Sequence, residues 1–380
     1  MQKLSTLGLL LFLFSSCSSI SFLSDEEEDL SIPAELKLFQ ESYSIERLWK
    51  KSFKGPNTLA SFKPSFYSGE MFVADASGAI SSIDPISGNV NWSIDLDKPL
   101  ASGIAAGYGK LVVGDTNGFV IALNTKTQEV LWEKNIGGEV LSRAVIDTSL
   151  IFIKNSAGEL IALDAESGIK EWVFRSQLPA LTIRGTGEPI IDSGMIFASF
   201  DNGRLGAFQL ETGFFLWDAP ISYMEGASEL ENLIDADSAP VIAKQLIFAA
   251  NYQGNLTAFD KAQKRAVWNA EASSFHSPVI GKGMIMVIGE SGSLQSYSLA
   301  NLSPSWTSDE YSRRDLSNGV IFDGLLLVGD LEGYVHLINP LNGLTVGRSR
   351  ISNKSIKSLV VFSGLAYAVD AGSNIIAITL

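Results

Sequence analysis

The sequence has one cysteine, two histidines and a shortage of basic residues, and each shortage counts against a class of protein. A single cysteine, Cys17, excludes an internal disulfide. The 28 basic residues face 42 acidic ones, and the formal net charge is -14. We therefore expect no nucleic-acid partner, because nucleic-acid binding rewards basic patches. The histidines, His276 and His336, offer little to a zinc site, which needs several converging ligands.

Long hydrophobic runs are also missing. The apolar run from Leu7 to Phe14 is too short to cross a bilayer as a helix. It follows Lys3 and precedes small residues, which is the pattern of a secretory signal, so residues 1–16 are predicted to be removed. The stretch FSSC resembles a bacterial lipobox, with Phe14 where leucine is usual, and this implies that Cys17 is lipidated (palmitate being one acyl group). The alternative is an ordinary signal peptide with a chance cysteine.

The residues after Cys17 predict a tether. Ser18 and Ser19 follow the cysteine where aspartate would mark inner-membrane retention, so the resemblance favours the outer membrane. The acidic run SDEEEDLS lacks apolar periodicity and repels itself, which is typical of an extended linker. We expect a lipidated cysteine and tether over 17–44 and a folded domain over 45–380.

An internal repeat dominates the rest of the chain. Six tryptophans recur at spacings of 40, 40, 45, 51 and 38 residues: Trp92, Trp132, Trp172, Trp217, Trp268 and Trp306. Each unit, as in AVIDTSLIFIKNSAGELIALDAESGIKEW, contains four short apolar segments separated by turn residues. Four strands in about 40 residues is the period of a propeller blade. The pattern predicts an all-β fold.

The repeat count predicts an eight-bladed β-propeller of four-stranded antiparallel blades. A seventh unit carries Gly347 where tryptophan is expected, and an eighth stops at Leu380 before its last strand. The segment Ile45–Ser52, with Trp49 at the repeat position, supplies the missing strand. An N-terminal strand that joins the C-terminal blade removes two unpaired edges and closes the ring. A seven-bladed ring that hides one irregular unit is the alternative.

The repeated side chains have structural interpretations. Evenly spaced tryptophans are typical of rings packed between neighbouring blades, and the alternative is an aromatic ligand platform. Asp75, Asp115 and Asp330 begin glycine-containing turns, which require no metal, although aspartates are also calcium ligands. The chain has no G-x-S-x-G, H-E-x-x-H or P-loop motif. We therefore expect neither catalysis nor a cofactor or metal.

The unit ALDAESGIKEW resembles the tryptophan-docking repeats of quinoprotein dehydrogenases. Together with the lipobox, the tether and eight units, it also resembles the BamB family, the propeller lipoproteins of the outer-membrane β-barrel assembly machinery. The more specific segments of this second resemblance are Leu181–Gly185, Leu233–Ile242, Tyr252–Asp260 and Leu325–Gly343. Dehydrogenases of the first kind are generally longer and commonly carry adjacent cysteines, which this sequence lacks.

Two repeats are longer than the others, and their extra residues fall between blades. They are RSQLPALTIRGTGE (Arg175–Glu188) and ISYMEGASELENLIDADSA (Ile221–Ala239), and the repeat places both on one face at neighbouring blades. Apolar anchors beside arginine, with carboxylates nearby, are typical of interfaces. The candidate partner-binding residues are Leu181, Ile183, Arg184, Asp235 and Asp237. The alternative is that the apolar pair tucks under its loop while the charges pair internally.

The BamB resemblance implies a function for these residues. It implies a non-catalytic, lipid-anchored scaffold on the outer membrane, facing the periplasm. It further implies that the five residues bind the POTRA repeats of the barrel-assembly subunit, and that the protein assists insertion of outer-membrane proteins. Contact with the unfolded substrates themselves is a weaker expectation. A quinone-dependent dehydrogenase, or a propeller lipoprotein that binds carbohydrate or another envelope partner, is the alternative function.

Overall fold

Strands make up all the regular secondary structure of the described residues, as the sequence predicts. The computed structural model describes residues 32–54, 62–140, 142–178, 187–222 and 238–380. These residues form no helix, so none of them forms a helix that could span a membrane. The chain divides into the units Met1–Ile32 and Pro33–Leu380, and the fold below is that of the second unit.

The first four blades follow one another along the chain, with four strands each. Blade one has β2 (Ser65–Tyr67), β3 (Glu70–Ala74), β4 (Ala79–Ile83) and β5 (Val90–Asp95). Blade two has β6 (Ala105–Gly107), β7 (Lys110–Gly114), β8 (Phe119–Asn124) and β9 (Val130–Asn135). Blade three has β10 (Val145–Ile146), β11 (Leu150–Lys154), β12 (Glu159–Asp164) and β13 (Lys170–Arg175). Blade four has β14 (Ile190–Asp192), β15 (Met195–Phe200), β16 (Arg204–Gln209) and β17 (Phe215–Pro220).

The last four blades complete the ring. Blade five has β18 (Val241–Ala243), β19 (Leu246–Ala250), β20 (Asn255–Asp260) and β21 (Arg265–Glu271). Blade six has β22 (Val279–Gly281), β23 (Met284–Ile288), β24 (Leu294–Ser298) and β25 (Pro304–Ser308). Blade seven has β26 (Val320–Phe322), β27 (Leu325–Gly329), β28 (Tyr334–Ile338) and β29 (Thr345–Arg350). Blade eight has β30 (Ile356–Phe362), β31 (Leu365–Asp370), β32 (Asn374–Thr379) and β1 (Glu46–Ser52).

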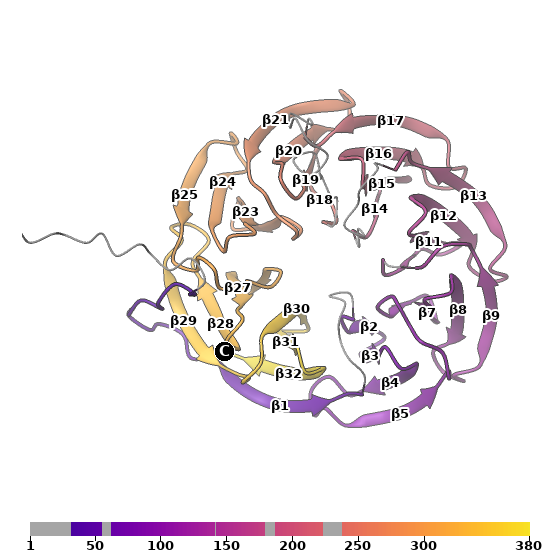
Figure 1. Cartoon of the computed structure of the whole chain (residues 1–380), viewed down its shortest axis with the longest axis horizontal. Coiled ribbons are helices and arrows are strands. Elements are labelled where there is room, and N and C mark those ends of the chain that lie inside the picture. The colour runs from indigo at the N-terminus through magenta and orange to yellow at the C-terminus, as the bar shows by residue number, and fades with distance from the viewer. Residues whose placement is uncertain (1–31, 55–61, 141, 179–186, 223–237) are drawn as a thin grey trace, which may run out of the picture. The chain divides into compact units, whose positions relative to one another are not determined.

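The ring closes through its first strand, and the prediction of eight blades is confirmed. The last sheet has the order β1-β32-β31-β30, and each of the other seven contains four consecutive strands. β1 pairs antiparallel with β32, with Trp49 opposite Ala377. Figure 1 shows the first and last strands, β1 and β32, side by side in this blade, next to blade one. The seven-bladed alternative is wrong, since no unit of the sequence is shared between two blades.

The hydrophobic core is divided among the junctions between blades. Eight clusters of buried apolar side chains each join two consecutive blades, and the one between blades eight and one contains Met71 and Tyr367. Middle strands such as β7 and β11 are buried along their whole length because both faces meet a neighbouring blade. Outer strands alternate between exposed and partly buried residues. Each blade therefore depends on both neighbours for burial.

The tryptophans dock one blade on the next, as predicted. Trp132 in blade two donates its indole N–H to the Ala165 carbonyl of blade three at 3.1 Å. The same bond runs from Trp49, Trp172 and Trp306 to the carbonyls of Pro85, Leu210 and Pro340 in the following blades. In all four cases the ring lies over a glycine of the receiving turn, where an added Cβ would come within 2.7 Å of the indole: Gly88, Gly168, Gly213 and Gly343.

Three tryptophans dock without this bond, and their receiving turns explain why. The turns that face Trp92, Trp217 and Trp268 carry the non-glycine residues Gln128, Lys264 and Leu302, all with positive φ. These turns carry a side chain where the other four have glycine, and the three described indoles make no hydrogen bond to them. Glycine in the repeat therefore serves close ring approach as well as backbone conformation.

Blade seven lacks a tryptophan because blade eight has no turn to receive one. The receiving turn joins the third and fourth strands, and in blade eight these are the last and the first strand, β32 and β1, which no turn connects. The incoming chain fills the place instead. The N–H groups of Ser42 and Tyr43 donate to the Val346 carbonyl at 2.8 and 3.1 Å, and a Cβ on Gly347 would lie 2.7 Å from the Tyr43 carbonyl oxygen.

The segment from Ala34 to Tyr43, here called the strap, lies along blades six and seven. Sequence analysis places it within a tether over 17–44, but its described part makes specific contacts. The Ala34 N–H donates to the Ser312 carbonyl at 3.0 Å, and Arg348 donates to the Lys37 carbonyl at 3.0 Å. The Arg348 guanidinium also lies 4.9 Å from the centre of the Phe39 ring. The strap is thus part of the folded unit.

We expect Gly168→Ala to lower the free energy of unfolding more than Gly194→Ala. Both glycines have left-handed φ values, +66° and +74°, so the backbone strain of introducing alanine is similar in the two variants. The added Cβ at Gly168 meets the Trp132 ring at 2.5 Å, whereas the one at Gly194 meets nothing within 4 Å. Displacing the indole should cost about 1–3 kcal/mol beyond the control, as overpacking usually does. Urea unfolding of both variants measures the difference, and equal losses would contradict the docking argument.

Candidate binding face

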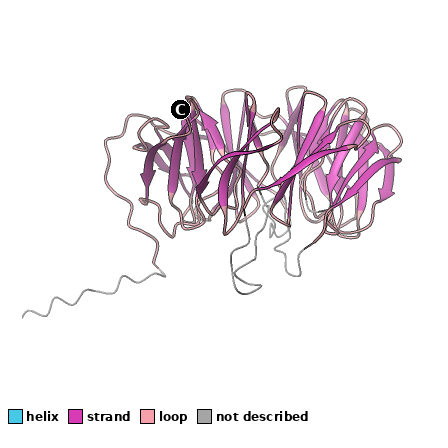
Figure 2. Cartoon of the chain, turned by 90° about the horizontal axis from the view of Figure 1, so that it is seen from above, coloured by secondary structure: helices cyan, strands magenta, loops and turns pink. Residues whose placement is uncertain are grey.

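The chain leaves each blade and enters the next at one face of the ring, here called the connection face. Each connection runs from the outer strand of one blade to the innermost strand of the next, and four antiparallel strands bring the two strand ends that it joins to the same face (Figure 2). Most connections are short, such as residues 272–278 and 351–355. The connections over residues 176–189 and 221–240 are the longest and occupy consecutive junctions, from blade three to four and from four to five.

The sequence-predicted partner-binding residues lie outside the described residues. Leu181, Ile183 and Arg184 fall in 179–186, and Asp235 and Asp237 fall in 223–237. Cys17, the predicted lipid attachment site, falls in 1–31. These six assignments therefore stay predictions. The structure does describe the residues that flank both long connections.

Charged side chains hold the end of the first long connection. Arg143, from the connection between blades two and three, donates two hydrogen bonds to the Glu188 carboxylate, at 3.1 and 2.9 Å. The buried Lys154 ammonium donates to the carbonyls of Gly187 and Ser199 at 3.2 and 2.7 Å. A forked arginine–carboxylate pair adds geometric constraint as well as energy. Residues 187–188 are thereby fixed to blade three and to the connection before it.

Buried hydroxyls hold both ends of the second long connection. Ser222 donates to the Asn251 side chain at 2.7 Å and accepts from the Asn255 N–H at 2.8 Å. Ser238 donates to the Ala250 carbonyl at 2.5 Å. The Ile221 carbonyl accepts a bond from Thr257 at 2.6 Å. The described ends of both long connections are therefore fixed to the ring, and the two connections are one blade apart.

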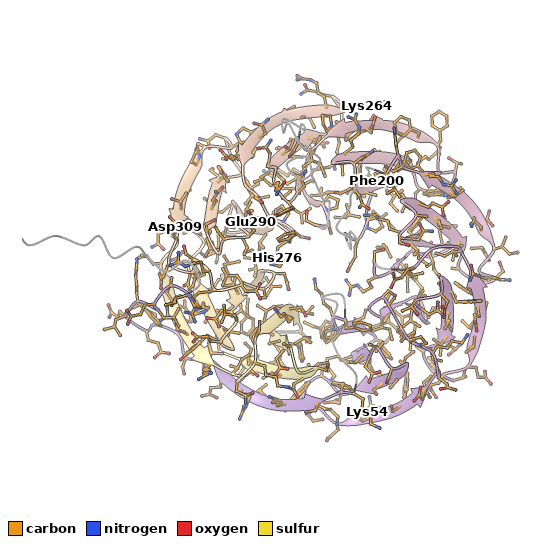
Figure 3. All side chains as sticks on the ribbon, in the orientation of Figure 1. Lys54, Phe200, Lys264, His276, Glu290 and Asp309 are labelled. Carbon is orange, nitrogen blue, oxygen red and sulfur yellow. The ribbon has the colours of Figure 1, made fainter. Side chains whose placement is uncertain are left out.

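A cavity of about 770 Å³ lies along the ring axis at the connection face, here called the axial cavity. Its lining comes from blade starts around the ring and includes Lys63, Arg143, Glu188, His276 and Lys357. His276 lies at the inner rim of blade six (Figure 3). Its Nε2–H donates to the Leu316 carbonyl at 2.9 Å, and burial lowers the pKa of its imidazole to about 4.

Sequence reasoning missed the axial cavity residues. Each polar residue stands just before, or at the start of, the innermost strand of its blade, in stretches such as FKPSF, SRAVI and FHSPVI. The available signal was a polar side chain at the same repeat position in several units. In the sequence that position marks only the start of a strand, and the repeat does not show that several blades converge there.

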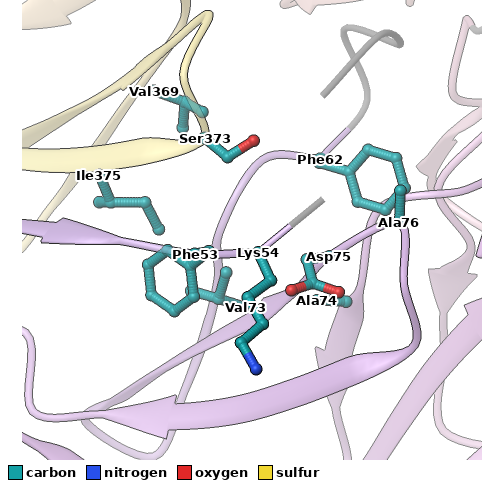
Figure 4. Close-up of a pocket in the computed structure, with 10 residues that line it drawn as sticks. All are labelled: Phe53, Lys54, Phe62, Val73, Ala74, Asp75, Ala76, Val369, Ser373 and Ile375. Atoms are coloured by element: carbon teal, nitrogen blue, oxygen red, sulfur yellow. The ribbon is translucent and has the colours of Figure 1, made fainter. Parts of the chain in front are cut away.

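A small cavity at the ring closure offers little to a ligand. Figure 4 shows it between blades eight and one, walled by apolar side chains that include Phe53, Phe62 and Val369, with Lys54 and Asp75 at its edge. Its free volume is about 20 Å³, which is close to the space of one water molecule. It is a packing gap at the ring closure.

The repeated aspartates act in turns. The Asp75 carboxylate accepts from the N–H groups of Ser77 and Ala79, and Asp115 and Asp330 accept the equivalent bonds in their blades. Within the described residues, no three histidine, cysteine, aspartate or glutamate side chains gather closely enough to hold a metal ion. His336 is fully buried and donates to Asp330 at 3.0 Å.

Fold and repeat together define a tryptophan-docked propeller with eight blades, and comparisons with known proteins narrow the class. The family model described as outer membrane protein assembly factor BamB matches residues 76–308. The protein of that name from Pseudomonas aeruginosa is 34% identical over 352 residues, which cover 92% of each chain. The chain belongs to the BamB family.

Solved structures agree on the fold. The crystal structure of BamB from Moraxella catarrhalis matches with a TM-score of 0.81 and 22% identity, covering 88% of this chain and all of that one. A quinohemoprotein alcohol dehydrogenase from Comamonas testosteroni matches with a TM-score of 0.69 and 13% identity, covering 88% of this chain and 76% of that one. Likeness at these identities concerns architecture alone, because one fold hosts many functions.

Proposed function

We propose that this protein is a non-catalytic scaffold of outer-membrane protein assembly, anchored through lipid on Cys17 to the outer membrane and facing the periplasm. It binds the POTRA repeats of the barrel-assembly subunit and thereby assists insertion of outer-membrane proteins. Family membership supports the assembly role, since the Pseudomonas aeruginosa relative is named an outer membrane protein assembly factor. The catalytic alternative has only the shared propeller architecture in its favour.

The observation that carries the partner surface is the pairing of the two long connections. They leave the ring at consecutive junctions of one face, and their described ends are fixed by the Arg143–Glu188 pair and the buried Ser222 and Ser238. Two adjacent long connections with fixed described ends support a local binding surface at this part of the face. In this proposal Leu181 and Ile183 are its apolar anchors. Arg184, Asp235 and Asp237 pair with polar groups of the partner.

Reversing two charges in these connections is expected to abolish partner capture. The double variant Arg184→Glu, Asp235→Lys should retain less than about a tenth of wild-type capture of the POTRA-containing subunit, since each reversed charge opposes its former partner. Pull-down with purified proteins at equal concentration measures it.

The matched control reverses the same kinds of charge in the short connection between blades one and two, as Asp97→Lys, Lys98→Glu. Lys98 pairs with Glu133 at the surface, where such pairs contribute little to stability. The control should capture the subunit as the wild type does. Undiminished capture by the folded Arg184, Asp235 variant rejects the site. Dye-linked dehydrogenase activity with added quinone rejects the non-catalytic role.

A further inference from the structure

The axial cavity concentrates positive charge in a protein whose net charge is -14. Among the described residues, three basic side chains line it, Lys63, Arg143 and Lys357, against one carboxylate, Glu188. Two of the three have ion-pair partners: Arg143 pairs with Glu188 at 2.9 Å, and Lys357 pairs with the exposed Asp315 at 2.7 Å. The Lys63 ammonium makes no hydrogen bond or ion pair with any described residue. Within the described part of the chain, Lys63 is therefore the lining cation without an ion-pair partner, and Glu188 offsets its charge only in part.

Lys63 is placed where a cation is unfavourable. Burial lowers the pKa of its ammonium, and the nearby Arg143 lowers this pKa further, while Glu188 raises it in part. Lys63 and Lys357 also act together on His276, since both lower the pKa of its ring. The three groups therefore interact electrostatically across the cavity. An anion bound here would replace the favourable interaction with water that the Lys63 ammonium loses on folding.

Apolar side chains form the rest of the wall. The innermost strands β26 and β30 contribute Val320, Ile321, Val360 and Val361, and Ile280 comes from β22. Phe275 lines the rim, where its ring stacks on Tyr252 with 4.5 Å between centroids. Basic groups at the rim beside an aliphatic wall suit a ligand that carries both carboxylate and apolar groups. The cavity volume is within the range that binds small ligands and short peptide segments.

We propose that the axial cavity binds an acidic peptide segment, with a carboxylate between Lys63 and Arg143 and neighbouring apolar side chains against β26 and β30. Charge complementarity argues for the carboxylate and the aliphatic wall argues for the side chains beside it. The choice of a peptide over other anions rests on the proposed function, in which the protein handles polypeptide partners. Its lining residues differ from the five residues proposed to bind POTRA repeats.

Fluorescence anisotropy with a rhodamine-labelled peptide, Gly-Val-Asp-Val-Asp-Val-Gly, tests the proposal on the purified protein. The same peptide with asparagine at both acidic positions is the ligand control. We expect the acidic peptide to bind at least about tenfold more tightly than the asparagine peptide, the difference that one charge-assisted hydrogen bond provides. Lys63→Gln should weaken the acidic peptide about tenfold and leave the asparagine peptide unchanged.

The matched protein control is Lys264→Gln. Lys264 is exposed on a turn at the outer rim of blade five (Figure 3), and blade two already carries Gln128 at the equivalent turn position. This variant should bind the acidic peptide like the wild type. The melting temperature of Lys63→Gln should equal or exceed that of the wild type, because the variant removes a partly buried cation that pairs with no described residue. A folded variant that binds poorly supports a ligand role for Lys63.

Several outcomes would overturn the proposal. Equal affinity for the two peptides would show that the carboxylate is not recognised. Undiminished binding by Lys63→Gln would show that the peptide does not bind at the axial cavity. Displacement of the peptide by equimolar inorganic phosphate reduces it to a simple anion site. Binding of phosphatidylglycerol vesicles without binding of the peptide assigns the cavity to lipid. POTRA capture measured on the same Lys63→Gln preparation keeps failure of this proposal distinct from failure of the proposed function.

Discussion

Replacing Arg314 with methionine is expected to lower the free energy of unfolding by about 3–5 kcal/mol, the usual cost of leaving one member of a buried ion pair alone. Arg314 is 3% exposed and donates to Asp330, which is fully buried, at 2.9 Å. Its other nitrogens donate to Glu332 and to the Ala34 carbonyl of the strap. One guanidinium therefore joins the interior of blade seven to the strap.

The matched control is Arg204→Met. Arg204 also pairs with an aspartate, Asp218, but both side chains are 38% exposed, so its loss should cost less than about 1 kcal/mol. Arg314→Lys keeps the charge but not the planar guanidinium that donates to three acceptors. Its loss of unfolding free energy should therefore lie between those of Arg314→Met and Arg204→Met. Urea unfolding measures all three variants. Proteolysis between residues 33 and 44 should accelerate only when Arg314 is changed, and equal losses for both methionine variants would contradict the buried-pair argument.

The sequence predicts the ring well because the ring is built from local patterns. Strand order, register and docking are written within each unit of about 40 residues, where Trp132, Trp172, Trp217, Trp268 and Trp49 all pair across strands with an alanine. A small residue opposite the indole leaves room for it, and its partner is a fixed number of positions away. Even the closing strand was predictable, because its Trp49 occupies the position of the repeat tryptophan in the fourth strand of a blade.

The exceptions to the repeat could be explained only from the three-dimensional structure. Gly347 breaks the pattern because the adjacent blade has no receiving turn there, and Tyr43, roughly three hundred positions earlier in the chain, fills the space. The strap itself reads as polar linker, since its bonds to Ser312 and Arg348 are mainly through backbone carbonyls and amides that no side-chain pattern records. The axial cavity joins residues from several units, and a one-dimensional repeat does not report what converges on its axis.

Acid is expected to destabilise the protein in two steps, and histidine causes the first. Burial holds the pKa of His276 at about 4 and that of His336 below its ordinary 6.5. Between these values the unfolded chain binds more protons than the folded one. Stability is therefore complete above pH 6.5 and falls as the pH drops toward 4. For His276 the difference of about 2.5 pH units corresponds to about 3 kcal/mol.

The second step belongs to carboxylates that the fold keeps ionised. Hydrogen bonds from His336 and Arg314 hold the pKa of Asp330 below its ordinary 3.8, against the opposing effect of burial. Bonds from Ser352 and Asn374 do the same for Asp370. Their contribution is complete above pH 3.8 and is lost as the pH falls further. Between pH 7 and 5, stability therefore depends on the histidines and not on the carboxylates.

Replacing the two histidines by glutamine should flatten the first step. At position 276 the amide N–H can still donate to the Leu316 carbonyl. In blade seven, His336 accepts from Arg348 through Nδ1 at 3.0 Å and donates to Asp330 through Nε2, and an amide offers one acceptor and one donor in the same way. Protonation of His336 would turn its acceptor nitrogen into a donor facing Arg348, which also holds the strap. Urea midpoints at pH 7.5, 5 and 3 measure both steps. If His276→Gln, His336→Gln loses as much stability between pH 7.5 and 5 as the wild type does, groups other than these histidines carry the acid response, and the assignment is wrong.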